Sequence, residues 1–307
     1  MRKGNIVPCL WFDHQAEEAA RFYVDTFGDG RIVNVSHYPE SGDNPSQKPP
    51  GSVLTVELEI GGQPLTALNG GPVFTPNPSI SFFVQVETAA EVDRIYAALA
   101  DGGAALMELG GYPWSERYAW VADRYGISWQ VMATERAKTA TIVPCLMFVG
   151  PQHGRAQEAM EHYTRVFPGG KIESIDRYTA EEAMPGTKGM EGAVKHGRFV
   201  IDGQELVAMD SGHAHAFNFN EAISLQLMCE DQAEIDKYWD ELIEGGGEPS
   251  VCGWLKDRFG VSWQVVPKAM AAWMTSQDKA ARDRAFRTML GMKKLDVAAL
   301  EAAMRGG

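Results

Sequence analysis

The stretch DRYGISWQV at residues 123–131 returns 134 residues later as DRFGVSWQV at residues 257–265, with seven of nine positions identical. Both copies read as a turn that begins with Asp and closes on Gly, followed by a β-strand. Because side chains alternate along a strand, Trp129 lies on one face and Gln130 on the other. We expect the Trp face to belong to the core, since a large aromatic side chain buries much apolar area.

The repeat extends over most of the chain. The offset between paired residues drifts between 134 and 143, as expected when only surface loops differ in length. Two copies, each long enough to own a core, indicate a duplicated domain and not a solenoid. The other paired stretches are 6–12 with 142–148, 16–32 with 156–172, 58–68 with 199–209, and 80–103 with 223–246.

Within one copy, the pattern strand, helix, strand, strand, strand occurs twice. Period-two and β-rich stretches mark the strands, and apolar residues at helical spacing mark the helices. Thr88 is the expected N-cap of the second helix, with Glu91 completing a capping box. The chain therefore holds four βαβββ modules of an α+β fold. The predicted strands of the first copy are 5–12, 31–38, 52–60, 64–68, 79–87, 104–109, 117–123 and 127–132, with helices at 14–27 and 88–100.

The last part of the chain has no counterpart in the repeat. Its apolar stripe, with Asp278 and Asp296 as N-caps, predicts two helices that pack on the second copy or across a dimer. We therefore expect a first domain at 1–136, a second at 137–268 and a helical extension at 269–307.

Charge and composition exclude several classes of partner. The net charge is −13, with 28 basic and 41 acidic residues, which disfavours nucleic acid and anionic membrane surfaces. The first residues do not resemble a signal peptide, and no apolar run of about 18 residues could span a membrane. We expect a cytoplasmic protein with no nucleic-acid or membrane partner, and a homodimer remains an open alternative.

The four cysteines indicate neither a disulfide framework nor a CxxC metal motif. Cys9 and Cys145 occupy matching IVPCL stretches and are interpreted as small core residues of equivalent strands. Cys252 precedes a Gly-Trp turn without a neighbouring His, which disfavours a nucleophilic role. The fourth is Cys229.

Paired βαβββ modules with these stretches resemble the vicinal oxygen chelate superfamily, which includes glyoxalase I, bleomycin-resistance proteins and extradiol dioxygenases. Residues 10–32, 219–248 and 253–267 are similar to the PhnB-like branch, which often carries the label 3-demethylubiquinone-9 3-methyltransferase. The resemblance covers about residues 5–267. It implies a tandem glyoxalase-like fold in which the two modules of each copy form a half-open mixed sheet around a cavity.

Metal-using members of that superfamily take four ligands from four strands of a domain. One carboxylate plus an amide is not a transition-metal site, and Arg198 would repel a cation. We therefore expect no metal cofactor. The resemblance places the slots at Val7 or Pro8, Glu57 or Glu59, Ser81 and Gln130 in the first copy, and at Val143 or Pro144, Arg198 or Val200, Ser224 and Gln264 in the second.

A second metal alternative uses His213 and His215, with Asp210 as a third ligand. These residues fall in a long polar stretch before a strand, so a solvated loop is the favoured interpretation.

Methyl transfer needs a site for S-adenosylmethionine, usually a glycine-rich turn between a strand and a helix. The glycine clusters at 61–62, 102–103, 110–111 and 245–247 instead follow helices or join antiparallel strands. The sequence therefore predicts no cofactor. The alternative of a 3-demethylubiquinone-9 3-methyltransferase-type enzyme on a quinone-like substrate rests on the family label alone.

The resemblance also implies that the concave face of each sheet lines a ligand pocket. We predict a metal-free protein that binds a small hydrophobic or aromatic molecule, and we assign no catalytic residue. One of the two pockets could instead have closed and serve as scaffold. The first pocket is expected to gather Glu57, Ser81 and Gln130 with Trp114 or Trp11 at its rim, and the second Arg198, Ser224 and Gln264 with Trp254 and Cys252.

Overall fold

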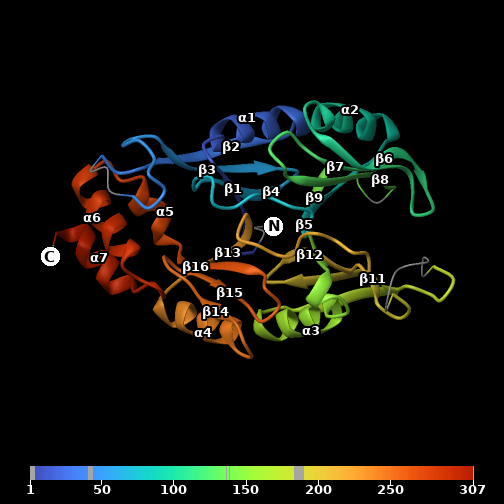
Figure 1. Cartoon of the computed structure of the whole chain (residues 1–307). Helices are drawn as coiled ribbons and strands as arrows, with labels where there is room; N and C mark the ends of the chain where they lie inside the picture. Colours follow the sequence, from blue (N-terminus) through green and yellow to red (C-terminus); the bar gives the residue numbers. More distant parts are fainter. Residues whose placement is uncertain (1–3, 41–43, 136, 138, 183–189, 307) are drawn as a thin grey trace.

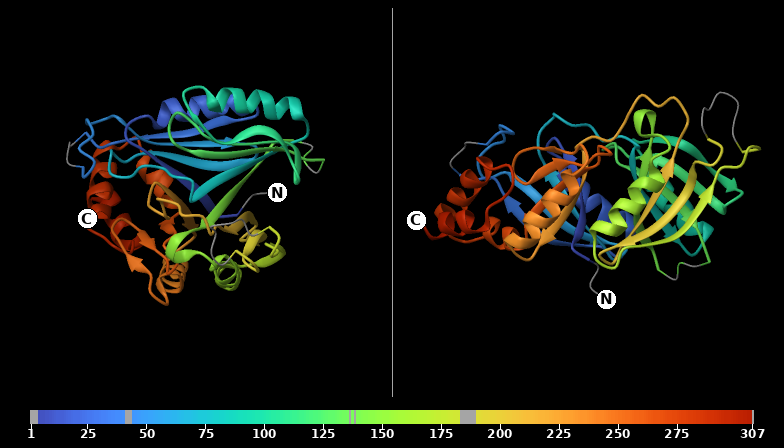
Figure 2. Two further views of the ribbon diagram at one scale, coloured as in Figure 1. Left: turned by 45° about the vertical axis from the view of Figure 1, so that its right-hand side comes forward. Right: turned by 90° about the horizontal axis from the view of Figure 1, so that it is seen from below.

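The computed structural model of the chain describes residues 4–40, 44–135, 137, 139–182 and 190–306. The two halves of the sequence form two layers, with helices on the outside of each layer and strands between them (Figure 1). The C-terminal helices lie together at one end of the molecule, as two further views confirm (Figure 2). Within the described part of the chain, no helix has the length and apolar character needed to cross a bilayer.

The four predicted βαβββ modules are confirmed, and the α+β fold class with them. The first module contains β1 (Ile6–Phe12), α1 (Ala16–Phe27), β2 (Arg31–His37), β3 (Val53–Ile60) and β4 (Gln63–Asn69). The second contains β5 (Ile80–Val86), α2 (Ala89–Ala100), β6 (Ala104–Tyr112), β7 (Ser115–Ala122) and β8 (Ser128–Ala133).

The second half repeats this order with one short additional helix. The third module contains β9 (Thr141–Phe148), η1 (Gly150–Gln152), α3 (Ala156–Val166), β10 (Lys171–Arg177), β11 (Val194–Ile201) and β12 (Gln204–Asp210). The fourth contains β13 (Ile223–Cys229), α4 (Gln232–Ile243), β14 (Glu248–Pro249), β15 (Trp254–Lys256) and β16 (Ser262–Pro267).

Local signals placed these elements correctly. Thr88 Oγ1 accepts a hydrogen bond from the Glu91 backbone N–H at 3.2 Å, and Glu91 Oε2 accepts one from the Thr88 N–H at 3.2 Å, so the capping box is confirmed. Gly126 closes the turn between β7 and β8 at φ 85°, a conformation that favours glycine. Trp129 on β8 is fully buried, as expected.

Each eight-stranded sheet combines one module from each half of the chain. Sheet A has the order β14-β15-β16-β13-β1-β4-β3-β2, and sheet B has the order β10-β11-β12-β9-β5-β8-β7-β6. Strand β1 runs antiparallel to β13, and β5 runs antiparallel to β9. This pairing corrects the expectation that the two modules of one copy build one sheet together.

The physical reason lies in the open edge that every module presents. The first strand of each module, β1, β5, β9 or β13, offers the same unpaired backbone groups, so it can pair with the first strand of any other module. The proposed division at 1–136, 137–268 and 269–307 therefore stays a prediction about the sequence repeat, which the sheets do not follow.

The two modules of one half are joined behind the sheets by the repeated phrase. Asp123 is 4% exposed, and its Oδ2 atom accepts hydrogen bonds from Tyr23 Oη on α1 and from Trp129 Nε1, both at 2.8 Å. Its Oδ1 atom accepts the backbone N–H groups of Tyr125 and Ile127 at 2.9 and 3.0 Å. One carboxylate thus fixes the turn and ties the helix of module one to the strands of module two.

The second half repeats this network. Asp257 accepts hydrogen bonds from Tyr163 at 2.6 Å, Trp263 at 2.9 Å, Phe259 at 2.9 Å and Val261 at 3.0 Å. Burial nevertheless raises the pKa of Asp257 to about 6, because removing a carboxylate from water opposes its ionisation more than the four donors favour it. The phrase occurs twice because each half needs the same anchor.

The C-terminal extension contains three helices and not two: α5 (Ala269–Met274), α6 (Lys279–Leu290) and α7 (Val297–Arg305). Asp278 and Asp296 cap α6 and α7 as predicted, accepting backbone N–H groups at 3.0 and 2.9 Å. The extension packs on both halves and not on the second alone: Phe286 contacts Tyr38 of the first half, and Lys294 pairs with Asp240 of α4 at 3.0 Å.

Candidate functional site

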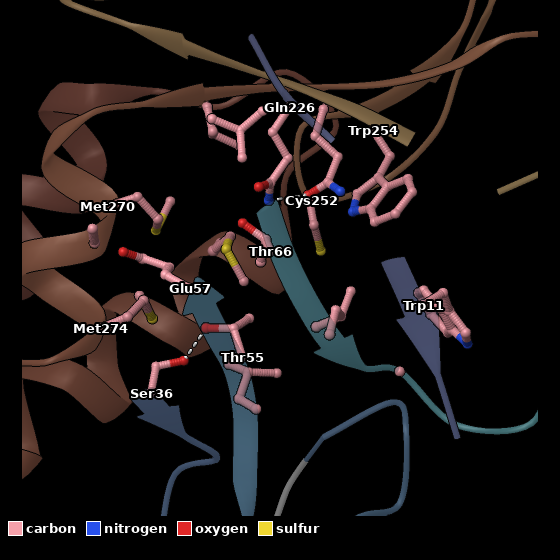
Figure 3. A pocket seen from close by; sticks show the side chains of 18 of the residues that line it. Trp11, Ser36, Thr55, Glu57, Thr66, Gln226, Cys252, Trp254, Met270 and Met274 are labelled. Carbon is pink, nitrogen blue, oxygen red and sulfur yellow. Dashed lines mark hydrogen bonds between the residues drawn. The ribbon is translucent and has the colours of Figure 1, made fainter. Parts of the chain in front are cut away.

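The concave face of sheet A encloses a cavity of about 980 Å³. Strands β1 to β4 of the first half form one wall, and β13 to β16 of the second half form the other. Helices α5 and α6 close one end (Figure 3). The size lies within the range of about 300–1,000 Å³ that is usual for small-molecule sites.

A short polar chain crosses the floor of the cavity. Gln264 Nε2 donates to Ser224 Oγ at 2.8 Å, and Gln226 Nε2 donates to Gln264 Oε1 at 3.1 Å. Ser224 and Gln264 were predicted to lie together, and they do. Gln226 was missed, although its position two residues after Ser224 on the same strand face could have identified it. Cys9 is buried beside these groups, and burial raises the pKa of its thiol to about 12.

Aromatic side chains form the other end of the cavity. The ring of Trp11 lies edge-on to Phe74 at 5.0 Å and to Trp254 at 6.0 Å between centroids. Trp11 Nε1 donates to the Gly71 carbonyl at 2.7 Å. A Cβ atom on Gly70 would come within 2.1 Å of the Trp11 ring, so glycine is required there. The two tryptophans, one from each half, were expected in different pockets and share this one.

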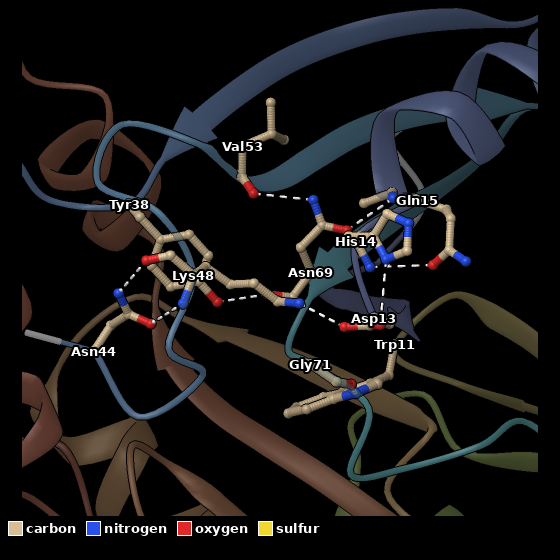
Figure 4. A network of polar contacts seen from close by, with 11 residues as sticks. Trp11, Asp13, His14, Gln15, Tyr38, Asn44, Lys48, Val53, Asn69 and Gly71 are labelled. Atoms are coloured by element: carbon tan, nitrogen blue, oxygen red, sulfur yellow. Dashed lines mark hydrogen bonds and ion pairs between the residues drawn. The ribbon is translucent and has the colours of Figure 1, made fainter. Parts of the chain in front are cut away.

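A polar network beside Trp11 fixes the chain segments that bring it there (Figure 4). Asn69 Oδ1 accepts the backbone N–H of Ala16 at 2.8 Å, and Asn69 Nδ2 donates to the Val53 carbonyl at 3.0 Å. Lys48 Nζ pairs with Asp13 Oδ1 at 2.5 Å and is only 15% exposed. The network ties the start of α1, strand β3 and the segment around Lys48 to the same edge of the cavity.

Glu57 projects from β3 into the cavity, toward the side that Met270 and Met274 close (Figure 3). Burial raises its pKa above the ordinary value, and a hydrogen bond from the Asn34 side chain opposes part of that rise. Among the described residues, Glu57 has no ion-pair partner, whereas its neighbour Glu59 pairs with Arg31 at 2.7 Å. A carboxylate in this environment can accept a proton or attract a cation.

Ser262 is a buried cavity residue whose polar atom is unsatisfied among the described residues. It is 1% exposed, and its hydroxyl has no hydrogen-bond partner among the described residues. The equivalent Ser128 in sheet B accepts a hydrogen bond from Trp120 Nε1 at 2.6 Å. Trp254 occupies the place of Trp120 in the strand register but contacts Trp11.

The concave face of sheet B is filled by its own side chains. Gln130 Nε2 donates to Ser81 Oγ at 2.9 Å, as the predicted pocket required, but Tyr118 Oη donates to Gln130 Oε1 at 2.6 Å and covers it. Gln130 is 2% exposed and Ser81 is 1% exposed. The residues that pack over them are Phe83, Tyr118, Val143, Cys145 and Val207, with Met107, Tyr112, Trp120, Met132 and Met209 at the edge.

Two further predicted site residues lie on sheet B, away from the cavity. Trp114 is 51% exposed and stacks on Tyr112 at 5.1 Å between ring centroids. Arg198 pairs with Glu205 at 2.7 Å and Glu173 at 3.3 Å, so its charge is neutralised within the sheet.

The predicted grouping of site residues therefore needs correction. Glu57 shares a cavity with Gln264, Trp254 and Cys252 and not with Ser81 and Gln130, because sheet A joins module one to module four. Cys252 lies at φ 58° on the cavity wall, and burial raises its pKa above the ordinary value. A repeat read along the sequence groups residues by half, whereas the cavity lies between the halves.

The proposed metal alternatives find no geometric support in the described residues. There, no group of three or more His, Cys, Asp or Glu side chains is arranged to hold a metal ion. Asp210 accepts backbone N–H groups of Gly154, Ala156 and Val194 at 2.8–3.2 Å, the role that Asn69 plays in the first half. His215 Nε2 lies 2.8 Å from Ser211 Oγ.

The repeat could not show that the C-terminal helices form a wall of the cavity. Met270, Met274, Phe286 and Met289 of α5 and α6 line it, together with Met228 of β13. These helices have no counterpart in the repeat, so the alignment of the two copies could not place them. Methionine side chains are flexible and polarisable and adapt to apolar ligands of irregular shape.

Comparisons with known proteins identify the family. A family model described as 3-demethylubiquinone-9 3-methyltransferase matches residues 4–132 and again 140–266. The chain therefore belongs to this family, on the PhnB-like branch of the vicinal oxygen chelate superfamily. Among curated proteins, none matches the chain.

Solved structures show similarity to one half or to the whole fold. The PhnB protein from Bacillus cereus is 35% identical over 42% of this chain and 98% of its own, with a TM-score of 0.38. Protein PA1353 from Pseudomonas aeruginosa is 27% identical over 41% of this chain and 93% of its own, with a TM-score of 0.35. Glyoxalase I from Zea mays covers 85% of this chain and 90% of its own at 11% identity, with a TM-score of 0.54, and shares the fold.

Proposed function

We propose that this protein binds a small hydrophobic or aromatic molecule in the cavity of sheet A, without a metal ion. The cavity combines a large volume, aromatic and methionine walls, and a few polar groups from both halves. Apolar walls with a few well-placed polar groups fix both the affinity and the orientation of a small ligand.

The observation that carries the proposal is the difference between two equivalent faces. The cup of sheet B is filled by its own side chains, so an open cup is not an unavoidable consequence of the fold. In sheet A the open space persists beside an unsatisfied buried hydroxyl on Ser262. Unsatisfied buried polar groups cost about 1–3 kcal/mol each, which a bound ligand that supplies a partner would recover.

The proposal also includes the role of sheet B, the class of partner and the location of the protein. Sheet B serves as a scaffold, in line with the alternative that one of two pockets has closed. The acidic net charge of −13 favours a small-molecule ligand over nucleic acid or membrane, and a cytoplasmic location over a membrane surface. A homodimer is retained as an alternative to a monomer.

The test uses a neutral fluorescent aromatic, pyrenemethanol, and two substitutions at Thr66, a buried residue on the cavity wall. We expect saturable binding to the wild type, weakened binding in Thr66→Phe because the ring projects into the cavity and obstructs part of it, and retained binding in Thr66→Val. Valine is the residue that sheet B carries at the equivalent Val207. Circular dichroism and the melting temperature check that both variants fold.

Two results would contradict the proposal. The first is a wild type that does not bind the probe, and the second is a folded Thr66→Phe variant that binds it as well as the wild type. Elemental analysis of purified protein should find less than stoichiometric metal, and EDTA should leave the melting temperature unchanged.

The methyltransferase alternative has a separate test. Titration with S-adenosylmethionine should produce no heat, because each glycine cluster follows a helix or lies in or between antiparallel strands. Micromolar binding of that cofactor would favour a methyltransferase on a quinone-like substrate instead.

A further inference from the structure

The charged side chains of the cavity are unevenly matched. Two basic residues, Arg31 and Lys256, and four acidic residues, Glu57, Glu59, Glu221 and Glu248, line it. Arg31 is engaged by Glu59 at 2.7 Å, and Lys256 by Glu221 at 2.8 Å. The cavity therefore carries an excess of negative charge.

Glu57 is the acidic residue of this set whose pKa is raised by burial. It stands opposite Thr66 of β4 and Asn34 of β2 in the sheet register, so its immediate neighbours on the sheet are neutral. Met270 and Met274 flank it on the helical side of the cavity (Figure 3). A carboxylate held there without a cation is destabilised by lost hydration, and burial raises its pKa accordingly.

The equivalent position in sheet B shows how the fold neutralises a charge when no ligand is needed. Arg198 occupies that position, opposite Val207, and pairs with both Glu173 and Glu205. In sheet A the residue in the place of Glu205 is Pro64, which offers no charge. The absence of a cationic partner for Glu57 among the described residues is therefore a local feature of the cavity.

The other walls of the cavity suit the apolar body of a cationic ligand. Trp11 and Trp254 present rings from opposite halves; aromatic rings pack against flat ligands, and their electron-rich faces attract cationic groups. Methionine thioethers supply adaptable apolar contact on the remaining side. Neither feature requires a metal or a second substrate.

The geometry points to a ligand that carries a protonated amine on an aromatic or hydrophobic body, with the ammonium group seated against the Glu57 carboxylate. This inference rests on the proposed function and adds the charge of the ligand to it. The bound cation replaces the hydration that Glu57 loses, so the same molecule without the charge binds less tightly.

The experiment compares pyrenemethylamine with pyrenemethanol, which share one ring system and differ in charge. We expect the amine to bind the wild type at least about tenfold more tightly than the alcohol. Glu57→Gln should lower the affinity for the amine to that for the alcohol and so remove this preference. Glu59→Gln is the matched control, because it removes the same charge from the same strand face, and it should keep the preference.

The possible results distinguish a failure of this inference from a failure of the proposed function. Equal binding of amine and alcohol by the wild type overturns the inference and leaves the proposed function standing. Loss of the preference in Glu59→Gln to the same extent as in Glu57→Gln also overturns it, because the effect is then a general field of the cavity. Failure of both probes to bind the wild type overturns the proposed function itself.

Discussion

The concave faces of sheet A and sheet B have the same strand order and register but opposite fillings. Where sheet B places Phe83, sheet A places Gln226, and where sheet B places Tyr118, the aligned residue of the second copy is Cys252. Sheet B thereby buries an apolar cluster, and sheet A keeps a cavity of about 980 Å³. A few side-chain volumes thus separate a filled face from an open cavity on one fold.

The convex backs of the two sheets, in contrast, are nearly identical. Both carry the Asp–Tyr–Trp network, with Asp123 in one half and Asp257 in the other. Duplicated domains are expected to keep what the fold needs and to vary what a ligand needs. We therefore expect substitutions on the backs to change stability and substitutions on the concave faces to change ligand binding.

The largest expected effect tests the equivalence of the backs. Asp123→Ala and Asp257→Ala should each lower the free energy of unfolding by about 3–5 kcal/mol, because each leaves four buried donors without an acceptor. Urea denaturation followed by circular dichroism measures this. Asp101→Ala is the control, since Asp101 forms only an exposed ion pair with Arg124 at 3.0 Å. A large difference between the two buried aspartates would show that the backs are not equivalent.

The next effect tests the difference between the concave faces. Phe83→Ala should cost about 3 kcal/mol in unfolding free energy, because it empties a packed cluster in which Phe83 is 6% exposed. Gln226→Ala at the equivalent place should cost less than about 1 kcal/mol, because it already borders open space. Similar losses in the two variants would mean that the cavity of sheet A is as tightly packed as sheet B in solution.

The smallest effect concerns a titratable difference between the backs. His162 on α3 replaces Phe22 of α1, is 1% exposed and has an unsatisfied Nε2 atom. Burial, followed by the charges of Arg258 and Arg165, lowers its pKa from 6.5 to about 4, although Glu244 and Glu158 oppose this. Between these values the unfolded chain binds a proton that the folded chain does not. His162 therefore stabilises the fold above pH 6.5, and that stability is lost as the pH falls toward 4.

His162→Phe, which copies the first half, should remove this loss. Relative to the wild type, the variant should gain about 2 kcal/mol in unfolding free energy between pH 7 and pH 4. Denaturation curves at several pH values measure the difference, and contributions of unchanged groups such as Asp257 cancel in it. A constant difference across this range would show that His162 titrates normally in the folded protein.

Much of the fold could be predicted from the sequence, because its signals are local. The capping box at Thr88, the glycine turn at Gly126 and the caps at Asp278 and Asp296 each depend on residues within a few positions of one another. The candidate site was predicted in parts. Ser224, Gln264 and Trp254 lie together on sheet A, whereas Glu57 and Arg198 each lie on a different sheet from their predicted partners.

The sequence by itself determined the duplication, the four βαβββ modules, the buried tryptophans and the acidic charge, because periodicity, turn chemistry and composition are properties of neighbouring residues. Only the tertiary structure decided which module edges pair, which cup stays open and that the C-terminal helices close it. The four first strands present equivalent backbone edges, so local pattern cannot choose among them, and the choice depends on packing between segments far apart in the chain.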